Sequence, residues 1–295
     1  MKVFVTGATG FVGSAVLKEL IQAGHEVTGL ARSDKAVKLL TEAGVAVHRG
    51  SLEDTDSLRQ AAREADGIIH LGFIHDFSDY TAAAEIDRLA IEAMGSELEG
   101  TDKPIVLTSG ALMVASGHVA TEEDKATAHA TRHSETAAHT LVQRGVKASV
   151  IRLAPSVHDV GDHGFVHTLI TIARSKGVSA YIGDGTNRWC AVHRLDAAVL
   201  FRKALERAAA GTMLHGIDEE AIPFREIAEV IGQELGLPVA SISADEAAEH
   251  FGWIHFAVAA DAPVSSKLTR EWMDWTPVHH GLIADLKQEH YFTEA

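Results

Sequence analysis

The sequence predicts an α/β protein with a doubly wound parallel sheet and a smaller, α-rich C-terminal lobe. Through the first 150 residues, short β-branched runs alternate with longer helical patterns, as in consecutive βαβ units. A glycine-rich turn joins the first strand of this series to the first helix. The alternation stops after Ile151, and from Ile222 short helices joined by loops follow one another.

Six strands are expected in the first half of the chain. They are Lys2–Val5, Glu26–Leu30, Ala46–His48, Gly67–Leu71, Ile105–Leu107 and Lys147–Ile151. The helix after the first strand has the clearest pattern, because Phe11, Val16 and Leu20 recur at helical spacing. Gly24 follows at the position where a left-handed residue commonly ends a helix.

The turn after the first strand reads Val5-Thr6-Gly7-Ala8-Thr9-Gly10-Phe11-Val12-Gly13. In a dinucleotide-binding turn, one glycine allows the tight turn, one lets the backbone approach the pyrophosphate, and one lets the helix pack closely on the strand. Because this turn follows a strand and opens an amphipathic helix, the pattern favours a Rossmann sheet over glycines that serve only the turn. The residues expected at the cofactor are Thr6, Gly7, Thr9, Gly10, Phe11, Val12 and Gly13.

The end of the second strand indicates which dinucleotide is bound. An NAD site usually has an acidic residue there to hold the ribose hydroxyls, whereas this chain has Arg32 followed by Ser33. A guanidinium beside a hydroxyl suits a 2′-phosphate. We therefore expect NADP(H) rather than NAD(H); the alternative is a solvated surface arginine.

The rest of the chain is expected to interleave two units. Further helices are predicted near Phe165–Ser175 and over Arg194–Ala210, Phe224–Leu235, Ala244–Phe251, Ser265–Met273 and Gly281–Gln288, with extended segments at Ala180–Ile182 and Met213–Gly216. Residues 1–155 with about 190–216 are assigned to the NADP-binding domain. Residues 156–189 with 217–295 are assigned to a substrate-binding lobe.

Composition limits the partners and the compartment. The 295 residues hold 26 Lys plus Arg against 41 Asp plus Glu, a formal charge of −15 that repels phosphate backbones and anionic membranes. Cys190 is the single cysteine, and no apolar run approaches the roughly 18 residues of a membrane span. We expect a cytoplasmic protein with a small-molecule substrate and with neither nucleic acid nor membrane as partner.

Several short motifs, taken together, resemble the short-chain dehydrogenase/reductase superfamily, on its extended or atypical side with the NAD-dependent epimerase/dehydratase proteins. They are Thr6 to Gly13, Gly50-Ser51-Leu52, His70-Leu71-Gly72-Phe73, Arg152 to Val157, Val192 to Asp196 and Trp275-Thr276-Pro277. Ser51 replaces the superfamily's usual Asp. The resemblance implies further cofactor contacts at Ser51, Leu52, Leu71, Gly72, Phe73, Pro155, Ser156 and Val157, and a homodimer by analogy.

The superfamily's usual acid–base pair is absent. That pair is a Tyr with a Lys four residues later, in which the ammonium lowers the pKa of the phenol. The three tyrosines of this chain, Tyr80, Tyr181 and Tyr291, are followed at that spacing by Ala84, Gly185 and Ala295. The usual proton transfer therefore cannot be assigned to this sequence.

Basic residues stand where the missing pair is expected. A helix is predicted over residues 126–138, and on it His129 and His133 lie one turn apart with Arg132 adjacent. This placement resembles an atypical subgroup of the superfamily in which basic residues replace Tyr and Lys. His129, with His133 or Arg132, would manage the proton, and the alternative is a solvated helix face.

Two hydroxyls at the end of the fifth strand are candidates for positioning the reacting oxygen. The superfamily has a catalytic Ser or Thr there, and this chain offers Ser109 or Thr108. For Ser109 the alternative is a cap of the strand end.

No metal site is expected, although His129/His133 and His163/His167 both have a spacing that can chelate zinc. Neither pair has a glutamate in the HExxH position, and Cys190 is alone. The residues expected at the substrate are instead His158, His163, Arg188 and Trp189, which lie where extended members build the pocket. For Trp189 the alternative is core packing.

The resemblance implies an oxidoreductase that transfers a hydride between NADP(H) and a small carbonyl or alcohol compound. The alternative from another class is a non-catalytic NADP(H)-binding redox sensor or regulatory protein. A nucleotide-sugar epimerase or dehydratase is a third possibility that the fold permits.

Overall fold

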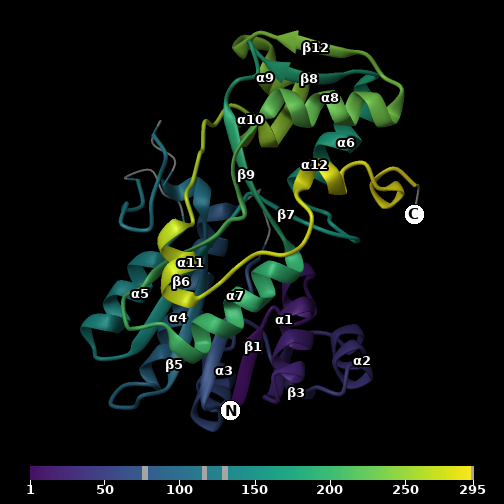
Figure 1. Ribbon diagram of the computed structural model, residues 1–295. Coiled ribbons are helices and arrows are strands. Elements are labelled where there is room, and N and C mark those ends of the chain that lie inside the picture. The colour runs from purple at the N-terminus through teal and green to yellow at the C-terminus, as the bar shows by residue number, and fades with distance from the viewer. Residues whose placement is uncertain (75–78, 115–117, 128–131, 294–295) are drawn as a thin grey trace.

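The computed structural model describes residues 1–74, 79–114, 118–127 and 132–293 (Figure 1). Its centre is a seven-stranded parallel sheet in the order β3-β2-β1-β4-β5-β6-β10. The strands are β1 (Lys2–Thr6), β2 (Glu26–Ala31), β3 (Ala46–Arg49), β4 (Gly67–His70), β5 (Pro104–Gly110), β6 (Lys147–Leu153) and β10 (Met213–Gly216). The strand order reverses between β1 and β4, where doubly wound sheets bind their ligands.

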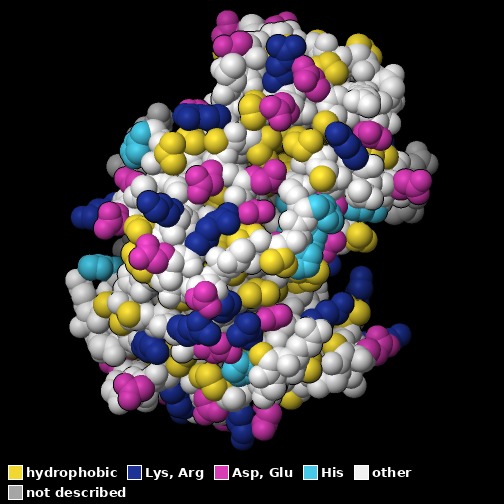
Figure 2. All heavy atoms as spheres, in the orientation of Figure 1, with side chains coloured by type: hydrophobic (Ala, Val, Ile, Leu, Met, Phe, Trp, Pro, Cys, Tyr) yellow, Lys and Arg dark blue, Asp and Glu magenta, His cyan; other side chains and the backbone are white. Residues whose placement is uncertain are grey.

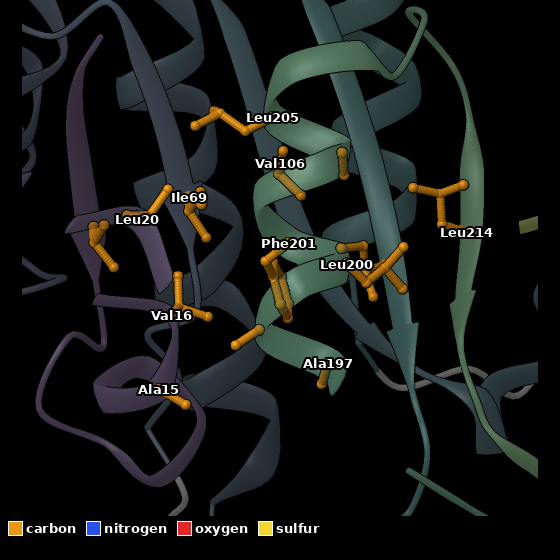
Figure 3. Close-up of a cluster of buried hydrophobic side chains, with 14 of the residues drawn as sticks. Ala15, Val16, Leu20, Ile69, Val106, Ala197, Leu200, Phe201, Leu205 and Leu214 are labelled. Atoms are coloured by element: carbon orange, nitrogen blue, oxygen red, sulfur yellow. The ribbon is translucent and has the colours of Figure 1, made fainter. Parts of the chain in front are cut away.

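Helices cover both faces of this sheet. They are α1 (Phe11–Gln22), α2 (Asp34–Glu42), α3 (Thr55–Glu64), α4 (Tyr80–Ser96), α5 (Ser134–Gln143) and α7 (Arg194–Arg207). On one face, Val16 and Leu20 of α1 and Phe201 of α7 share a buried apolar cluster with Ile69 of β4 and Val106 of β5 (Figure 3). A second buried cluster joins α3, α4 and α5 to the opposite face. The predicted α/β class with a doubly wound parallel sheet is therefore confirmed.

The remaining chain forms a smaller lobe above the carboxyl ends of the strands (Figure 1). It contains a three-stranded sheet of β7 (Ser156–His158), β9 (Arg188–His193) and β11 (Glu219–Pro223), and the strand pair β8 (Ser179–Ile182) with β12 (Val239–Ile242). Its helices are α6 (Phe165–Lys176), α8 (Phe224–Leu235), α9 (Ala244–Phe251), α10 (His255–Val258) and α12 (Leu282–Asp285), with single turns η2 (Gly252–Ile254) and η3 (Glu289–Tyr291). The helix α11 (Lys267–Met273) and the turn η1 (Ala111–Val114) instead pack with the core of the large sheet. The interleaved division of the chain stays a prediction.

One predicted helix is wrong at its start. Residues 126–138 were expected to be helical, but α5 begins at Ser134, and Arg132 and His133 lie in the segment before it. His129 lies outside the described residues. Because His133 precedes the helix, α5 does not carry the face that the sequence predicts for His129 and His133.

Among the described residues, every helix is too short or too polar to cross a lipid bilayer.

Candidate active site

The glycine turn between β1 and α1 has the close packing that its sequence predicts. Gly7 has φ +66°, and a Cβ there would lie 2.7 Å from the backbone nitrogen of Gly72. A Cβ on Gly13 would lie 2.0 Å from the carbonyl oxygen of Gly7. Because both contacts are with backbone, neither position accepts a larger residue without moving the turn.

The N-terminus of α1 is open above this turn. The helix begins at Phe11 after Gly10, without a side-chain cap and without an acidic residue in its first turn. The first N–H groups of a helix lack partners within the helix and carry the positive end of its dipole. This end of α1 is therefore suited to the pyrophosphate of a dinucleotide.

Other predicted cofactor residues surround the turn. The hydroxyl of Thr6 accepts a hydrogen bond from the N–H of Gly72 at 3.0 Å. Leu52, after β3, lies against Gly72, where a Cβ would come within 3.1 Å of its side chain. Ser51 and Leu71 are half-buried in the same loops. The structure therefore brings the ends of β1, β3 and β4 together at the edge where the turn lies.

Arg32 and Ser33 follow β2 at the same edge. Arg32 is exposed and forms no salt bridge within the parts of the chain that the structure describes. Ser33 caps α2, and its hydroxyl accepts from the N–H of Ala36 at 3.2 Å. Its guanidinium therefore lies exposed at the sheet edge that bears the glycine turn.

The two candidate hydroxyls of β5 differ in what they contact. Thr108 donates to the carbonyl oxygen of His70 at 2.8 Å, a bond that ties β5 to β4. Ser109 is buried and its side chain makes no hydrogen bond with any described residue. Successive side chains of a strand point to opposite faces, so the two hydroxyls cannot serve the same oxygen. Ser109 is the better candidate because its hydroxyl is uncommitted.

Arg132 lies at the carboxyl edge of β4, over the aromatic ring of Phe73. The guanidinium carbon is 4.4 Å from the centre of that ring. The Nε of Arg132 donates to the hydroxyl of Ser134 at 2.8 Å, and Nη2 lies 3.5 Å from Oδ1 of Asp87. His133 is half-buried beside it, directly before α5.

Behind Arg132 lies a buried pair that no sequence motif indicates, His70 and Asp87. Nε2 of His70 is 3.1 Å from Oδ1 of Asp87, and Nδ1 of His70 is 2.7 Å from the hydroxyl of Thr6. Burial raises the pKa of the Asp87 carboxyl, but the hydrogen bond from His70 and the charge of Arg132 outweigh it, and that pKa lies below its usual value. The available signal was a carboxylate within the apolar stripe of α4, between Ala84 and Ile91.

The predicted substrate residues are not all brought together. His158 ends β7 beside His193, which ends β9, and the ring of His163 lies 5.8 Å from that of Phe11 in the glycine turn. Arg188 begins β9, five residues before His193 and therefore about 16 Å from it.

Arg188 and Trp189 have structural partners instead. The Arg188 guanidinium donates twice to the carboxylate of Asp261, from Nε at 2.9 Å and from Nη2 at 2.7 Å. Trp189 is only 2% exposed, packs in the core of the lobe, and donates its indole N–H to the hydroxyl of Ser156 at 2.9 Å. The structure thus favours the core-packing alternative for Trp189, and the substrate role of Arg188 stays a prediction. Ser156, expected at the cofactor with Pro155 and Val157, is itself buried.

Histidines gather on the face near α12 (Figure 2). Nδ1 of His158 and Nε2 of His280 each lie 2.9 Å from a carboxylate oxygen of Asp285. Burial alone would raise the pKa of Asp285, but these two hydrogen bonds outweigh that effect and the pKa falls to about 2. The ring of His193 stacks on His279 with 4.5 Å between ring centres.

Three of the nearby side chains offer possible metal ligands. Atoms of His193, Asp196 and His279 lie within 4.8 Å of one another. The carboxylate of Asp196 already accepts from the backbone N–H groups of Val278 and His279, and Nδ1 of His193 accepts from Leu195. These hydrogen bonds give the three side chains a structural role, because they cap the start of α7 and tie it to the segment that holds His279. The absence of a metal stays a prediction.

Comparison with known proteins decides the family. Over residues 3–215 the sequence matches the profile of the NAD dependent epimerase/dehydratase family. The chain belongs to this family. Membership makes it an NAD(P)-binding Rossmann protein related to oxidoreductases and epimerases, in agreement with the resemblance that the motifs indicate.

Two relatives span nearly the whole chain. An uncharacterized protein of Schizosaccharomyces pombe is 45% identical over 295 residues, covering 99% of this chain and 100% of the relative. An uncharacterized protein of Saccharomyces cerevisiae is 47% identical over 292 residues, covering 97% and 98%. The 2-alkyl-3-oxoalkanoate reductase of Stenotrophomonas maltophilia is 28% identical over 257 residues, covering 81% and 77%.

Solved structures of the epimerase/dehydratase type share the fold. The UDP-glucuronic acid 4-epimerase of Bacillus cereus, in complex with UDP-glucuronic acid and NAD, superposes with a TM-score of 0.77 over 98% of both chains. Its sequence identity to this chain is 15%, so the likeness concerns the fold alone.

Proposed function

We propose that the protein is an NADP(H)-dependent oxidoreductase that transfers a hydride between NADP(H) and a small carbonyl or alcohol compound. The observation that carries this proposal is the guanidinium of Arg132, held over Phe73 at the sheet edge that also bears the open N-terminus of α1. A cation beside a dinucleotide turn can stabilise the negative charge that develops on a carbonyl oxygen as hydride arrives. The similarity to a 2-alkyl-3-oxoalkanoate reductase supports reduction as the reaction class.

The residues present fit the cofactor. The Gly7 and Gly13 positions leave room for the backbone to approach a pyrophosphate, and Arg32 would take the 2′-phosphate. When bound, the reduced nicotinamide would supply the hydride. The finer assignment of NADP(H) over NAD(H) rests on Arg32 alone.

The protein's own groups would divide the remaining work. Ser109 and Arg132 would bind the substrate oxygen, Ser109 through its hydroxyl and Arg132 through its charge. An arginine side chain keeps its proton, so Arg132 orients and stabilises but does not act as the acid. The proton would come from His133, or from His129, which lies outside the described residues.

Cofactor choice is tested by titration with NADPH and NADH, following fluorescence. Wild-type protein should bind NADPH more tightly. Arg32→Asp should weaken NADPH binding by roughly 10- to 100-fold, since hydrogen bonds to a charged group contribute about 1.5–3 kcal/mol. Lys35→Asp, an exposed position on α2 with the same charge change, is the matched control. Equal binding of NADH by the wild type, with no effect of Arg32→Asp, would overturn the NADP(H) assignment.

Turnover is tested by the loss of NADPH absorbance with a panel of ketones and aldehydes, each compared with protein-free solution. Turnover of at least one carbonyl compound supports the oxidoreductase. Tight NADPH binding without turnover of any compound would instead favour the redox sensor. His129→Ala and His133→Ala are then compared in a pH–rate profile, and unchanged turnover in both would contradict the assigned proton donors.

A further inference from the structure

A carboxylate is buried in the middle of helix α4. The side chain of Asp87 has no exposed surface and lies on the stripe that α4 presents to α3 and α5, between alanines and Ile91. Removing an ionised carboxylate from water costs several kcal/mol unless other groups bind it. Asp87 therefore requires partners, and these identify its role.

Both oxygens of Asp87 lead to the same guanidinium. Oδ2 accepts from the hydroxyl of Ser134 at 2.8 Å, and that hydroxyl in turn accepts from Nε of Arg132 at 2.8 Å. Oδ1 lies 3.5 Å from Nη2 of Arg132, which is buried and has no hydrogen-bond partner of its own. Asp87 thus contacts Arg132 once directly and once through Ser134.

The other side of Asp87 leads to the glycine turn. The hydroxyl oxygen of Thr6 accepts from the N–H of Gly72. The hydroxyl proton of Thr6 is therefore available to Nδ1 of His70, 2.7 Å away. With Nδ1 accepting from Thr6, it is Nε2 of His70 that donates to Oδ1 of Asp87, 3.1 Å away. The donors and acceptors of this series therefore match in one direction, from Gly72 through Thr6 and His70 to the carboxylate of Asp87.

Arg132 keeps some exposed surface outside this series of hydrogen bonds. Its side chain is 13% exposed, and Nη1 makes no hydrogen bond within the part of the molecule that the structure describes. Asp87 offsets the positive charge of Arg132, so the two form a neutral pair with one donor still available. Such a donor suits the oxygen of an uncharged carbonyl group better than a carboxylate, which would need an unbalanced cation.

We propose that Asp87 is a positioning residue that holds the guanidinium of Arg132 over Phe73, and that Thr6 and His70 fix Asp87 relative to the dinucleotide turn. The inference rests on the proposed function, because it assigns Arg132 to the substrate oxygen. It extends that function by explaining why an arginine can stand at a fixed place before α5 without being part of a helix.

A double-mutant cycle tests the positioning role with the carbonyl compound that the wild type reduces best. Asp87→Asn keeps the shape of the side chain and removes its charge, and it should lower kcat about tenfold or more. If Asp87 acts through Arg132, the same substitution should cause no further loss in an Arg132→Ala background. Glu92→Gln removes a charge from the same helix on its outer side and should leave kcat unchanged. Equal losses from Asp87→Asn in both backgrounds, or no loss in either, would overturn the proposal.

A second measurement does not depend on turnover. In protein labelled with ¹⁵N arginine, the Nε–H resonance of Arg132 should be visible and slow to exchange, because that proton is bonded to Ser134. Asp87→Asn should shift this resonance or abolish its protection. If Asp87→Asn fails to fold, Asp87→Ser replaces it, since a serine also removes the charge while leaving Ser134, the direct acceptor of the Arg132 Nε–H, in place. Unaltered protection in a folded variant refutes the positioning role even if no carbonyl compound is reduced, whereas lost protection without any turnover refutes only the proposed function.

Discussion

Acid should destabilise this protein through His193. The ring is 3% exposed, stacks on His279, and meets His158 edge-on with 5.3 Å between ring centres. Its burial lowers the pKa to about 4, against the opposing charge of Asp159. Since the folded protein holds His193 neutral, protonation favours the unfolded chain.

The pH range follows from the two pKa values. An unfolded histidine titrates near 6.5, so the stability contributed by neutral His193 is complete above that pH and is lost as the pH falls toward 4. A difference of about 2.5 pKa units corresponds to about 3 kcal/mol when fully expressed, and to about 2 kcal/mol at pH 5. The free energy of unfolding should therefore decrease by about this amount between pH 7 and pH 5 because of this residue.

Urea unfolding, followed by tryptophan fluorescence at pH 7, 6 and 5, measures the effect. His193→Asn is the informative variant, because its amide oxygen can still accept from the N–H of Leu195 at the start of α7 but does not titrate in this range. Between pH 7 and pH 5, the free energy of unfolding of His193→Asn should fall by about 2 kcal/mol less than that of the wild type. His139→Asn, at an exposed position of α5, should follow the wild type. Parallel curves for the wild type and His193→Asn would refute the reasoning.

Three further substitutions have defined outcomes. Gly13→Ala should weaken NADPH binding at least tenfold in a titration, because its Cβ would meet the carbonyl oxygen of Gly7 at 2.0 Å; unchanged binding would show that the turn can move. Trp189→Phe should lower the free energy of unfolding by about 1–3 kcal/mol in urea, since the buried Ser156 hydroxyl loses its donor; an added Ser156→Ala should recover part of this if the bond is the cause. Asp285→Asn should cost about 2 kcal/mol at pH 7, and the difference from wild type should shrink below pH 4, because a carboxyl with a pKa of about 2 stabilises the fold only while ionised.

The cofactor half was predictable from the sequence because its signals are local. Strand alternation and glycine spacing describe backbone geometry within a few residues, and β1, β2 and β3 were each predicted to within one residue of their observed ends. The contact that requires Gly13 is with Gly7, six residues earlier in the same turn. Such constraints are visible in a single sequence.

The substrate half depends on contacts between distant residues, which a single sequence does not show. Arg188 is predicted at the substrate, and its guanidinium donates to Asp261, 73 positions later in the chain. The indole of Trp189 finds Ser156, 33 positions earlier. For both residues the sequence shows the chemistry of the side chain but not its partner in the fold. That partner decides whether the side chain is free to bind a ligand or makes a structural contact.

The loss of the Tyr and Lys pair separates two tasks that one hydrogen-bonded pair usually combines. A phenol near an ammonium can both stabilise an oxyanion and supply its proton. Arg132 can do the first and not the second, because a guanidinium does not release its proton. If the protein reduces a carbonyl group, the proton must therefore come from a different side chain than the charge, and the buried Asp87 explains how the charge could be kept in place without the helix that normally carries it.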